Sequence, residues 1–139
     1  MSFEGERSLL PELQILGWLR FSRAFDQGLK PDVHEQEYEI HYIVKGKLNW
    51  WVEDKNYSMR SGMVMIIKSN ENHGSRTGVL EPCEHYWLRF SFPEKDGLPG
   101  LDVAETQLLR EAFIGFKSVC FGFLLRCVIK SPYFLKNIV

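Results

Sequence analysis

The chain has 139 residues, of which 45% are hydrophobic and 25% are charged, with a formal net charge of −1. This length and balance fit one globular domain that buries a core without metal or disulfide support. The near-neutral charge, without any local basic cluster, excludes a surface built for nucleic acid, so we expect no direct nucleic-acid contact from this chain.

The first two thirds of the chain predict β-strands. Residues 1–12 are charged, contain Pro11 and indicate a loosely held arm. Residues 13–25 alternate between apolar and polar side chains, although a short helix is an alternative there. Lys45 to Lys47 predicts a turn, and Asp54 to Asn56 predicts the tip of a hairpin. The predicted strands are residues 13–25, 37–44, 48–53, 57–59, 63–67 and 84–93.

The period of the pattern changes after residues 94–100, which contain Pro and Gly. Asp102 followed by Glu105 resembles a capping box and predicts the start of a helix. Apolar residues then recur at steps of three and four, from Leu108 to Val119, which is helical spacing. Gly115 and Gly122 can bend or split this helix. The fold class is therefore mainly β with one or two C-terminal helices.

Polar side chains lie beside several of the predicted strands. Because strand residues alternate between two faces, Glu39 and His41 share one face, as do His34 and Gln36. In residues 84–93 the same rule gives two sets. We expect His85, Trp87, Arg89 and Ser91 to line a cavity, and Tyr86, Leu88, Phe90 and Phe92 to form core. Alternation also predicts that one of Trp50 and Trp51 points inward.

Each of these residues also has a structural interpretation. Trp87 could simply fill the core, Arg89 could reach solvent or pair with a glutamate, and His41 could be a hydrogen-bonded strand residue. If the strands close into a small barrel, the polar residues converge in its mouth. We then expect His34, Glu39, His41, His73, His85, Trp87 and Arg89 to bind a ligand.

Three motifs occur in an order typical of a known family. They are Tyr-Glu-Ile-His-Tyr-Ile-Val-Lys-Gly at 38–46, Ser-Gly-Met at 61–63 followed by His73, and Tyr-Trp-Leu-Arg-Phe-Ser at 86–91. Together they resemble the N-terminal cupin-like domain of AraC-family transcription regulators, over residues 33–92. The sequence departs from that pattern at Ser61, Met63 and Arg89, where the family often has Pro, Asp and His.

The resemblance implies a double-stranded β-helix (jelly-roll) barrel in residues 1–100, with the N-terminal arm, that binds a small-molecule effector. It implies that residues 101–139 form a helical segment, packed on the barrel within the same domain, that pairs two chains into a homodimer. The family's DNA-binding helix-turn-helix region has no counterpart in these 139 residues.

The sequence also resembles catalytic cupins, which implies a metal alternative. Their ligand pattern falls on His34, Gln36, Glu39 and His73, with Gln36 in a histidine position. Two imidazoles and a carboxylate can form a facial triad for iron. This leaves a metal-dependent dioxygenase or sugar isomerase as the second hypothesis, and an interaction module with an empty pocket as the third.

The remaining motifs favour a protein that is not an enzyme. No serine stands in a Gly-x-Ser-x-Gly setting and no glycine-rich phosphate loop occurs, so we expect no catalytic residue and no cofactor. Cys83, Cys120 and Cys127 are odd in number and lack CxxC spacing, which indicates reduced thiols in a cytoplasmic protein. We expect neither a signal peptide nor a membrane span.

Overall fold

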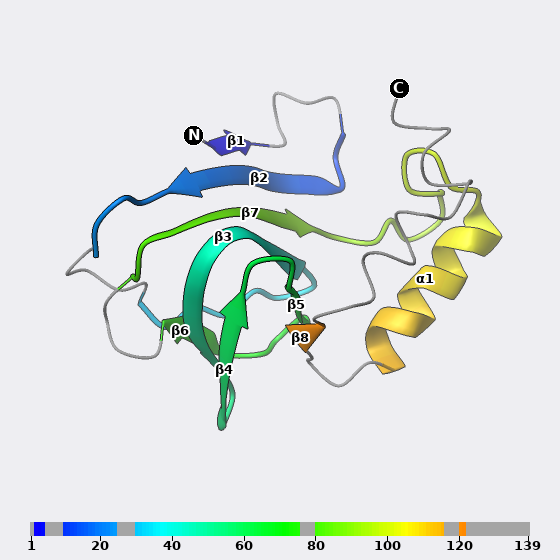
Figure 1. The fold of residues 1–139 in the computed structure, drawn as a ribbon. Coiled ribbons are helices and arrows are strands. Elements are labelled where there is room, and N and C mark those ends of the chain that lie inside the picture. Colours follow the sequence, from blue (N-terminus) through cyan, green and yellow to red (C-terminus); the bar gives the residue numbers. More distant parts are fainter. Residues whose placement is uncertain (1, 5–9, 25–29, 76–79, 116–119, 122–139) are drawn as a thin grey trace.

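The structure, a computed structural model, describes residues 2–4, 10–24, 30–75, 80–115 and 120–121. The elements are β1 (Ser2–Glu4), β2 (Leu13–Arg20), β3 (Tyr38–Val52), β4 (Lys55–Arg60), β5 (Val64–Ile67), β6 (His73–Ser75), β7 (Cys83–Phe90), α1 (Val103–Gly115) and β8 (Cys120–Phe121). Strands β1 to β7 precede a single described helix, as predicted, and a short strand, β8, follows it (Figure 1).

The strands form one antiparallel sheet in the order β1-β2-β7-β3-β5-β8, with β4 and β6 also pairing with β3. Two predictions change here. Residues 2–4 of the predicted arm pair with β2, and residues 73–75, which lie outside the predicted strands, pair with the end of β3. Both differences arise from partners that are distant in the sequence.

The turn predicted at Lys45 to Lys47 is wrong, because β3 runs through it as one curved strand of 15 residues. The register with β7 shifts between Ile43 and Lys45, and Gly46 has a positive φ of 89°. A Cβ atom at Gly46 would lie 2.3 Å from the carbonyl oxygen of Pro82, so glycine permits this close approach. The chain bulges here instead of reversing.

The bulge exchanges the two faces of β3. Before it, the odd-numbered residues Glu39, His41 and Ile43 are buried; after it, the even-numbered Leu48, Trp50 and Val52 are buried. The first half of β3 pairs with β7 and β5, and the second half pairs with β4 and β6. One strand therefore contributes to two walls of the barrel, which Figure 1 shows as a strong curve.

The apolar core lies at one side of the barrel interior. It contains Ile43, Leu48, Trp50, Val52, Met59, Met65, Ile67, Leu80 and Cys83. Cys83 is a buried free thiol, as expected. Strand β5 is almost fully buried, which agrees with its continuous apolar sequence.

Helix α1 packs beside the end of the sheet (Figure 1). Asp102 and Glu105 form the predicted capping box, because each accepts a hydrogen bond from the backbone N–H of the other, at 2.8 and 3.0 Å. The Phe113 ring meets Tyr38, Phe90 and Phe92, with ring centroids 5.6–5.7 Å apart. We call these four residues the outer aromatic cluster.

The apolar stripe predicted for the helix coincides only in part with the face of α1 that is buried. Thr106 and Phe113 are buried, whereas Leu108 is 67% exposed. The expected positions 116–119 lie outside the described residues, and Cys120–Phe121 form a short strand on β5 within the segment predicted as helical. Among the described residues, no helix has the length and apolar character that crossing a bilayer requires.

Candidate functional site

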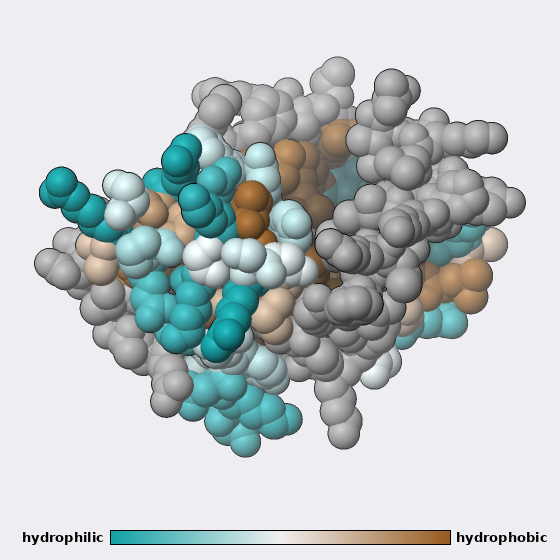
Figure 2. Space-filling view, viewed as in Figure 1, coloured by the Kyte–Doolittle hydropathy of each residue, from teal (hydrophilic) through white to brown (hydrophobic). Residues whose placement is uncertain are grey.

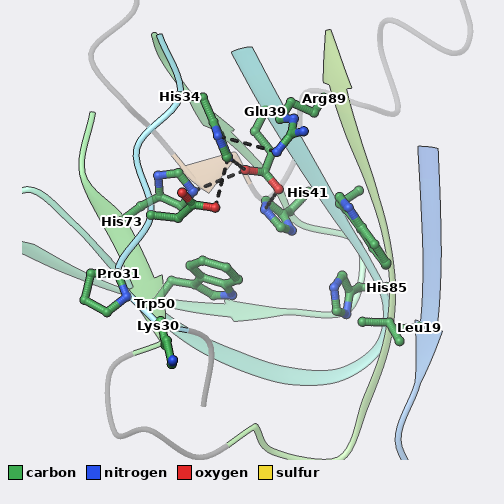
Figure 3. A pocket seen from close by; sticks show the side chains of 12 residues that line it. Leu19, Lys30, Pro31, His34, Glu39, His41, Trp50, His73, His85 and Arg89 are labelled. Atoms are coloured by element: carbon green, nitrogen blue, oxygen red, sulfur yellow. Dashed lines mark hydrogen bonds and ion pairs between the residues drawn. The ribbon is translucent and has the colours of Figure 1, made fainter. Parts of the chain in front are cut away.

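A cavity of about 500 Å³ opens inside the barrel (Figure 3). Strands β2, β3, β6 and β7 and the segment before β3 supply its walls. The lining residues are Leu19, Lys30, Pro31, Asp32, His34, Glu39, His41, Trp50, His73, His85, Trp87 and Arg89. Apart from Leu19 and Pro31, the lining side chains are therefore polar or aromatic.

Two loops hold His34 and His73 side by side. Asp32 and His73 exchange backbone hydrogen bonds of 2.9 and 3.0 Å, and the Asn70 N–H donates to the carbonyl of His34 at 2.9 Å. The Gln36 N–H donates to the Ser69 hydroxyl at 2.8 Å. These contacts bring the His34 and His73 rings to a centroid distance of 5.2 Å. His34 thus reaches the cavity from a loop and not from the strand face predicted for it.

The Glu39 carboxylate is the centre of the polar end of the cavity. Its Oε2 atom lies 3.2 Å from Nε2 of both His34 and His73, and its Oε1 atom lies 3.1 Å from Nε2 of His41. Burial raises the pKa of Glu39, but the contacts with His41 and His73 outweigh it and hold that pKa well below its usual range. Glu39 is therefore a carboxylate in the folded protein.

The hydrogen bonds assign the ring protons of two histidines. Nδ1 of His73 donates to the carbonyl of Glu71 at 2.9 Å, so its Nε2 faces Glu39. Burial lowers the pKa of His73, but Glu39 and this backbone contact outweigh it and raise that pKa overall. This favours an imidazolium that donates from both nitrogens.

In His34, unlike His73, the Nδ1 atom accepts a hydrogen bond. Its Nδ1 lies 3.5 Å from the guanidinium of Arg89, which can only donate, so Nδ1 accepts. The proton of His34 therefore sits on Nε2, which donates to Glu39 at 3.2 Å. Arg89 itself forms an ion pair with Glu37, with Nε 2.9 Å from Oε2.

Aromatic rings continue from this polar end along the wall. Centroid distances of 4.8–6.0 Å connect His73 to Trp50, Trp50 to His41, His41 to His85, and His85 to Trp87. Burial and the neighbouring His41 lower the pKa of His85 to about 4 despite the opposing charge of Glu39, so His85 is neutral at pH 7. Figure 3 shows Trp50 beside Pro31 and Lys30, and His85 beside Leu19, on the side of the view away from His34 and Arg89.

Some buried polar atoms of the lining have no hydrogen-bond partner within the described part of the chain. They include Nε1 of Trp50, which is 2% exposed, and Nδ1 of His41. Nε2 of His41 lies at ion-pair distance from Glu39 without hydrogen-bond geometry. A buried donor without an acceptor is costly, so these atoms mark where a bound molecule would be stabilised.

All seven predicted ligand-binding residues line this cavity, although their binding of a ligand stays a prediction. Gln36 does not line it, and its φ of 60° lies outside strand geometry. Tyr86, predicted as core, is 46% exposed. Sequence reasoning left open which of Trp50 and Trp51 is inward, since the bulge in β3 decides it. It missed Leu19, Lys30, Pro31 and Asp32, which only the closure of the barrel brings to the mouth.

The donor set of a cupin metal centre fits this site in part. Ligand atoms of His34, Glu39 and His73 all lie within 4.8 Å of one another. The Nδ1–H of His73 donates to a carbonyl, the usual outer-shell contact of a histidine ligand. Arg89 opposes a metal, because its positive charge faces His34 and places that ring's proton on the nitrogen that would bind the ion.

The comparisons with known proteins agree with this architecture. Residues 19–100 match the model of the AraC-like ligand binding domain, and the chain belongs to that family. No curated protein is similar enough to match it.

The solved structures extend the comparison to the fold. A predicted oxalate decarboxylase from Thermotoga maritima superposes with a TM-score of 0.51 at 18% identity, over 63% of this chain and 74% of that one. A cupin protein from Bacteroides fragilis has a TM-score of 0.49 at 15% identity, over 70% and 81%. At such identities the likeness shows the fold alone. The prediction of a cupin-like barrel followed by a C-terminal helix is confirmed.

Proposed function

We propose that this domain senses a small molecule in its barrel and passes the signal on as part of an AraC-type transcription regulator. One observation carries the proposal: a cavity of about 500 Å³ in which buried polar atoms, above all Nε1 of Trp50, lack partners within the described residues. Membership of the AraC-like ligand binding domain family supports it. In this proposal, DNA is contacted by a region outside residues 1–139.

The lining favours a sugar-like molecule or a carboxylate. Glu39 and the imidazoles can accept from or donate to hydroxyl groups, and the indole faces of Trp50 and Trp87 can stack on a ring. Arg89 could bind a carboxylate, but it already pairs with Glu37 at 2.9 Å. Hydroxyl groups therefore suit the cavity with less rearrangement than a carboxylate does.

Switching requires the ligand to prefer one arrangement of the domain. His34 hydrogen-bonds to Glu39 and Arg89, and its backbone carbonyl accepts from Asn70 in the loop that leads to His73. A ligand that displaces the His34 side chain would loosen both loops at the mouth. In this proposal, bound and free forms differ first in these loops.

We further propose that residues 1–100 form the sensing barrel and residues 101–139 pair two chains. Support comes from the outward side of α1, where Val103, Leu108 and Ile114 are 58–67% exposed. Figure 2 shows brown side chains at the right-hand edge, where Figure 1 places α1. Exposed apolar side chains of this kind are stabilised by covering them.

Ligand binding is tested by thermal unfolding of protein treated with a chelator. D-xylose, D-glucose, D-glucuronate, maltose and benzoate are added one at a time, and a binder raises Tm with its concentration. Trp50→Phe keeps the ring but removes the indole N–H, so a true cavity ligand loses affinity in that variant. A Tm that no compound moves in the wild type contradicts the proposal for these ligand classes.

Pairing is tested by sedimentation velocity. Leu108→Glu with Ile114→Glu places charges on the exposed side of α1 and is expected to convert dimer to monomer. Gln107→Glu on the same helix, also exposed, adds charge without removing an apolar side chain and serves as the control. A wild type that sediments as a monomer at all concentrations contradicts the pairing proposal.

The second candidate is a metal-dependent cupin enzyme, favoured by the proximity of His34, Glu39 and His73. These residues would hold the ion, which would supply Lewis-acid or oxygen chemistry when bound. Elemental analysis decides between the candidates. Stoichiometric iron, manganese or zinc that is lost in both His34→Ala and His73→Ala favours the enzyme, and ligand-raised Tm in metal-free protein favours the sensor.

A further inference from the structure

Strand β2 approaches the cavity closely at one residue, Gly17. Gly17 is the direct cross-strand partner of Trp87 in the pairing of β2 with β7. Its neighbour Leu16 is 45% exposed, and Trp18 donates its indole N–H to Glu84 on the other side of the sheet. Alternation therefore directs position 17 into the barrel, where glycine has no side chain.

The Trp87 indole occupies the space that a side chain at position 17 would need. A Cβ atom added to Gly17 would lie 2.1 Å from Cζ2 of Trp87 and 2.3 Å from both Cε2 and Cη2. These are atoms of a rigid ring and not the end of a flexible chain. Carbon atoms pack at about 3.5–4.0 Å, so the ring would have to move by about 1.5 Å.

The direction of that movement is restricted. On one flank the Trp87 ring meets His85, with centroids 5.6 Å apart, and His85 is 2% exposed. The ring also lines the cavity, where there is empty space. A side chain at position 17 would therefore push the indole into the cavity and narrow it.

We propose that Gly17 is a specificity-determining residue, because its missing side chain lets Trp87 lie against β2 and so sets the width of the ligand cavity. This inference rests on the proposed ligand-sensing function. A larger residue at position 17 would restrict the domain to smaller ligands.

The test combines a structural and a binding readout. Protein labelled with 5-fluorotryptophan gives one ¹⁹F signal for each of its four tryptophans, and Trp87→Phe assigns the signal of Trp87. Gly17→Ala is expected to shift the Trp87 signal more than any other. Gly74→Ala is the matched control, because a Cβ there would meet Trp51, which does not line the cavity, at 3.1 Å.

Binding is then measured by calorimetry for D-xylose, D-glucose, D-glucuronate and maltose. Gly17→Ala is expected to lower the affinity for the largest compound that the wild type binds by at least about tenfold. The affinity for the smallest compound that binds is expected to change by less than about threefold. Gly17→Ala combined with Trp87→Phe is expected to restore binding of the larger compound, since the phenylalanine ring needs less room than the indole. This rescue separates a narrowed cavity from a misfolded one.

The outcomes are distinguishable. An unmoved Trp87 signal in Gly17→Ala overturns the inference whatever binds. If the signal moves and the wild type binds but selectivity is unchanged, the inference is wrong and the proposed function stands. If the wild type binds no compound of the series, the proposed function fails for these ligands and the inference fails with it.

Discussion

At the mouth of the barrel, the two faces of the sheet carry different kinds of side chain. Tyr38 and Glu39 are neighbours in β3, yet Tyr38 joins the outer aromatic cluster under α1 and Glu39 is the charged centre of the cavity. The same holds in β7, where Arg89 faces inward and Phe90 joins the cluster. The interior of the barrel mouth is the polar face, which reverses the usual distribution.

This difference separates stability from function. Packing of large aromatic rings under α1 stabilises the fold, because each ring removes apolar area from water. The cavity lining lowers the stability of the fold. It holds a buried carboxylate, three imidazoles in contact with that carboxylate, and an indole N–H without a partner among the described residues. Such a lining is retained where binding requires it. Substitutions on the two faces should therefore have different consequences.

The largest loss of stability is expected on the outer face. Phe113→Ala removes a ring that contacts the other three members of the cluster, and we expect the free energy of unfolding to fall by about 4 kcal/mol. Chemical denaturation measures it. Ile114→Ala, at the next position and 60% exposed, is the control and should change that free energy by less than about 0.5 kcal/mol. Equal losses in the two variants would show that α1 does not pack as described.

The second largest loss of stability is expected from a substitution at the charged centre of the cavity. Glu39→Gln removes the negative charge that His41, His73 and the partly buried His34 share, and we expect a loss of about 3 kcal/mol at pH 7. Lys47→Gln, which breaks the partly exposed pair with Glu81, should cost less than about 1 kcal/mol. A Glu39→Gln protein as stable as the wild type would contradict the central role of this carboxylate.

Acidification should weaken the cavity face through His85. Because burial lowers the pKa of His85 from 6.5 to about 4, the unfolded chain takes up its proton first as the pH falls. The free energy of unfolding contributed by neutral His85 is present above pH 6.5 and is lost as the pH falls toward 4, by about 3 kcal/mol.

His85→Asn isolates this contribution, because its unfolding free energy should fall less than that of the wild type between pH 7 and pH 4. Glu39, His41 and Cys83 also face His85, and they are common to both proteins. If the unfolding free energies of the two proteins fell in parallel with pH, the loss could not be assigned to His85.

The smallest effect is expected where a polar atom has no partner. Trp50→Phe removes a buried N–H that no acceptor satisfies, so the change in unfolding free energy should stay below about 1 kcal/mol. The same substitution is expected to weaken ligand binding. A loss of several kcal/mol in ligand-free protein would mean that the indole N–H already has a partner.

The sequence by itself determined that most of the strands precede the helix and that Asp102 and Glu105 form its capping box. It also determined the set of polar and aromatic residues in the cavity, and the order of the motifs assigned the chain to one family. These features depend on alternation, helical spacing and residue type, which are local. In residues 84–93 it also distinguished His85, Trp87 and Arg89 as lining residues, whereas Ser91 does not line the cavity and Tyr86, predicted as core, is exposed.

Only the tertiary structure decided how these pieces meet. The bulge between Ile43 and Lys45 exchanges the faces of β3 and makes Trp50, not Trp51, part of the cavity wall. Contacts between two loops carry His34 to Glu39, and the closeness of Gly17 to Trp87 sets the cavity's width. The physical reason is that register, closure and the space beside a residue depend on strands far apart in the chain, which no local pattern specifies.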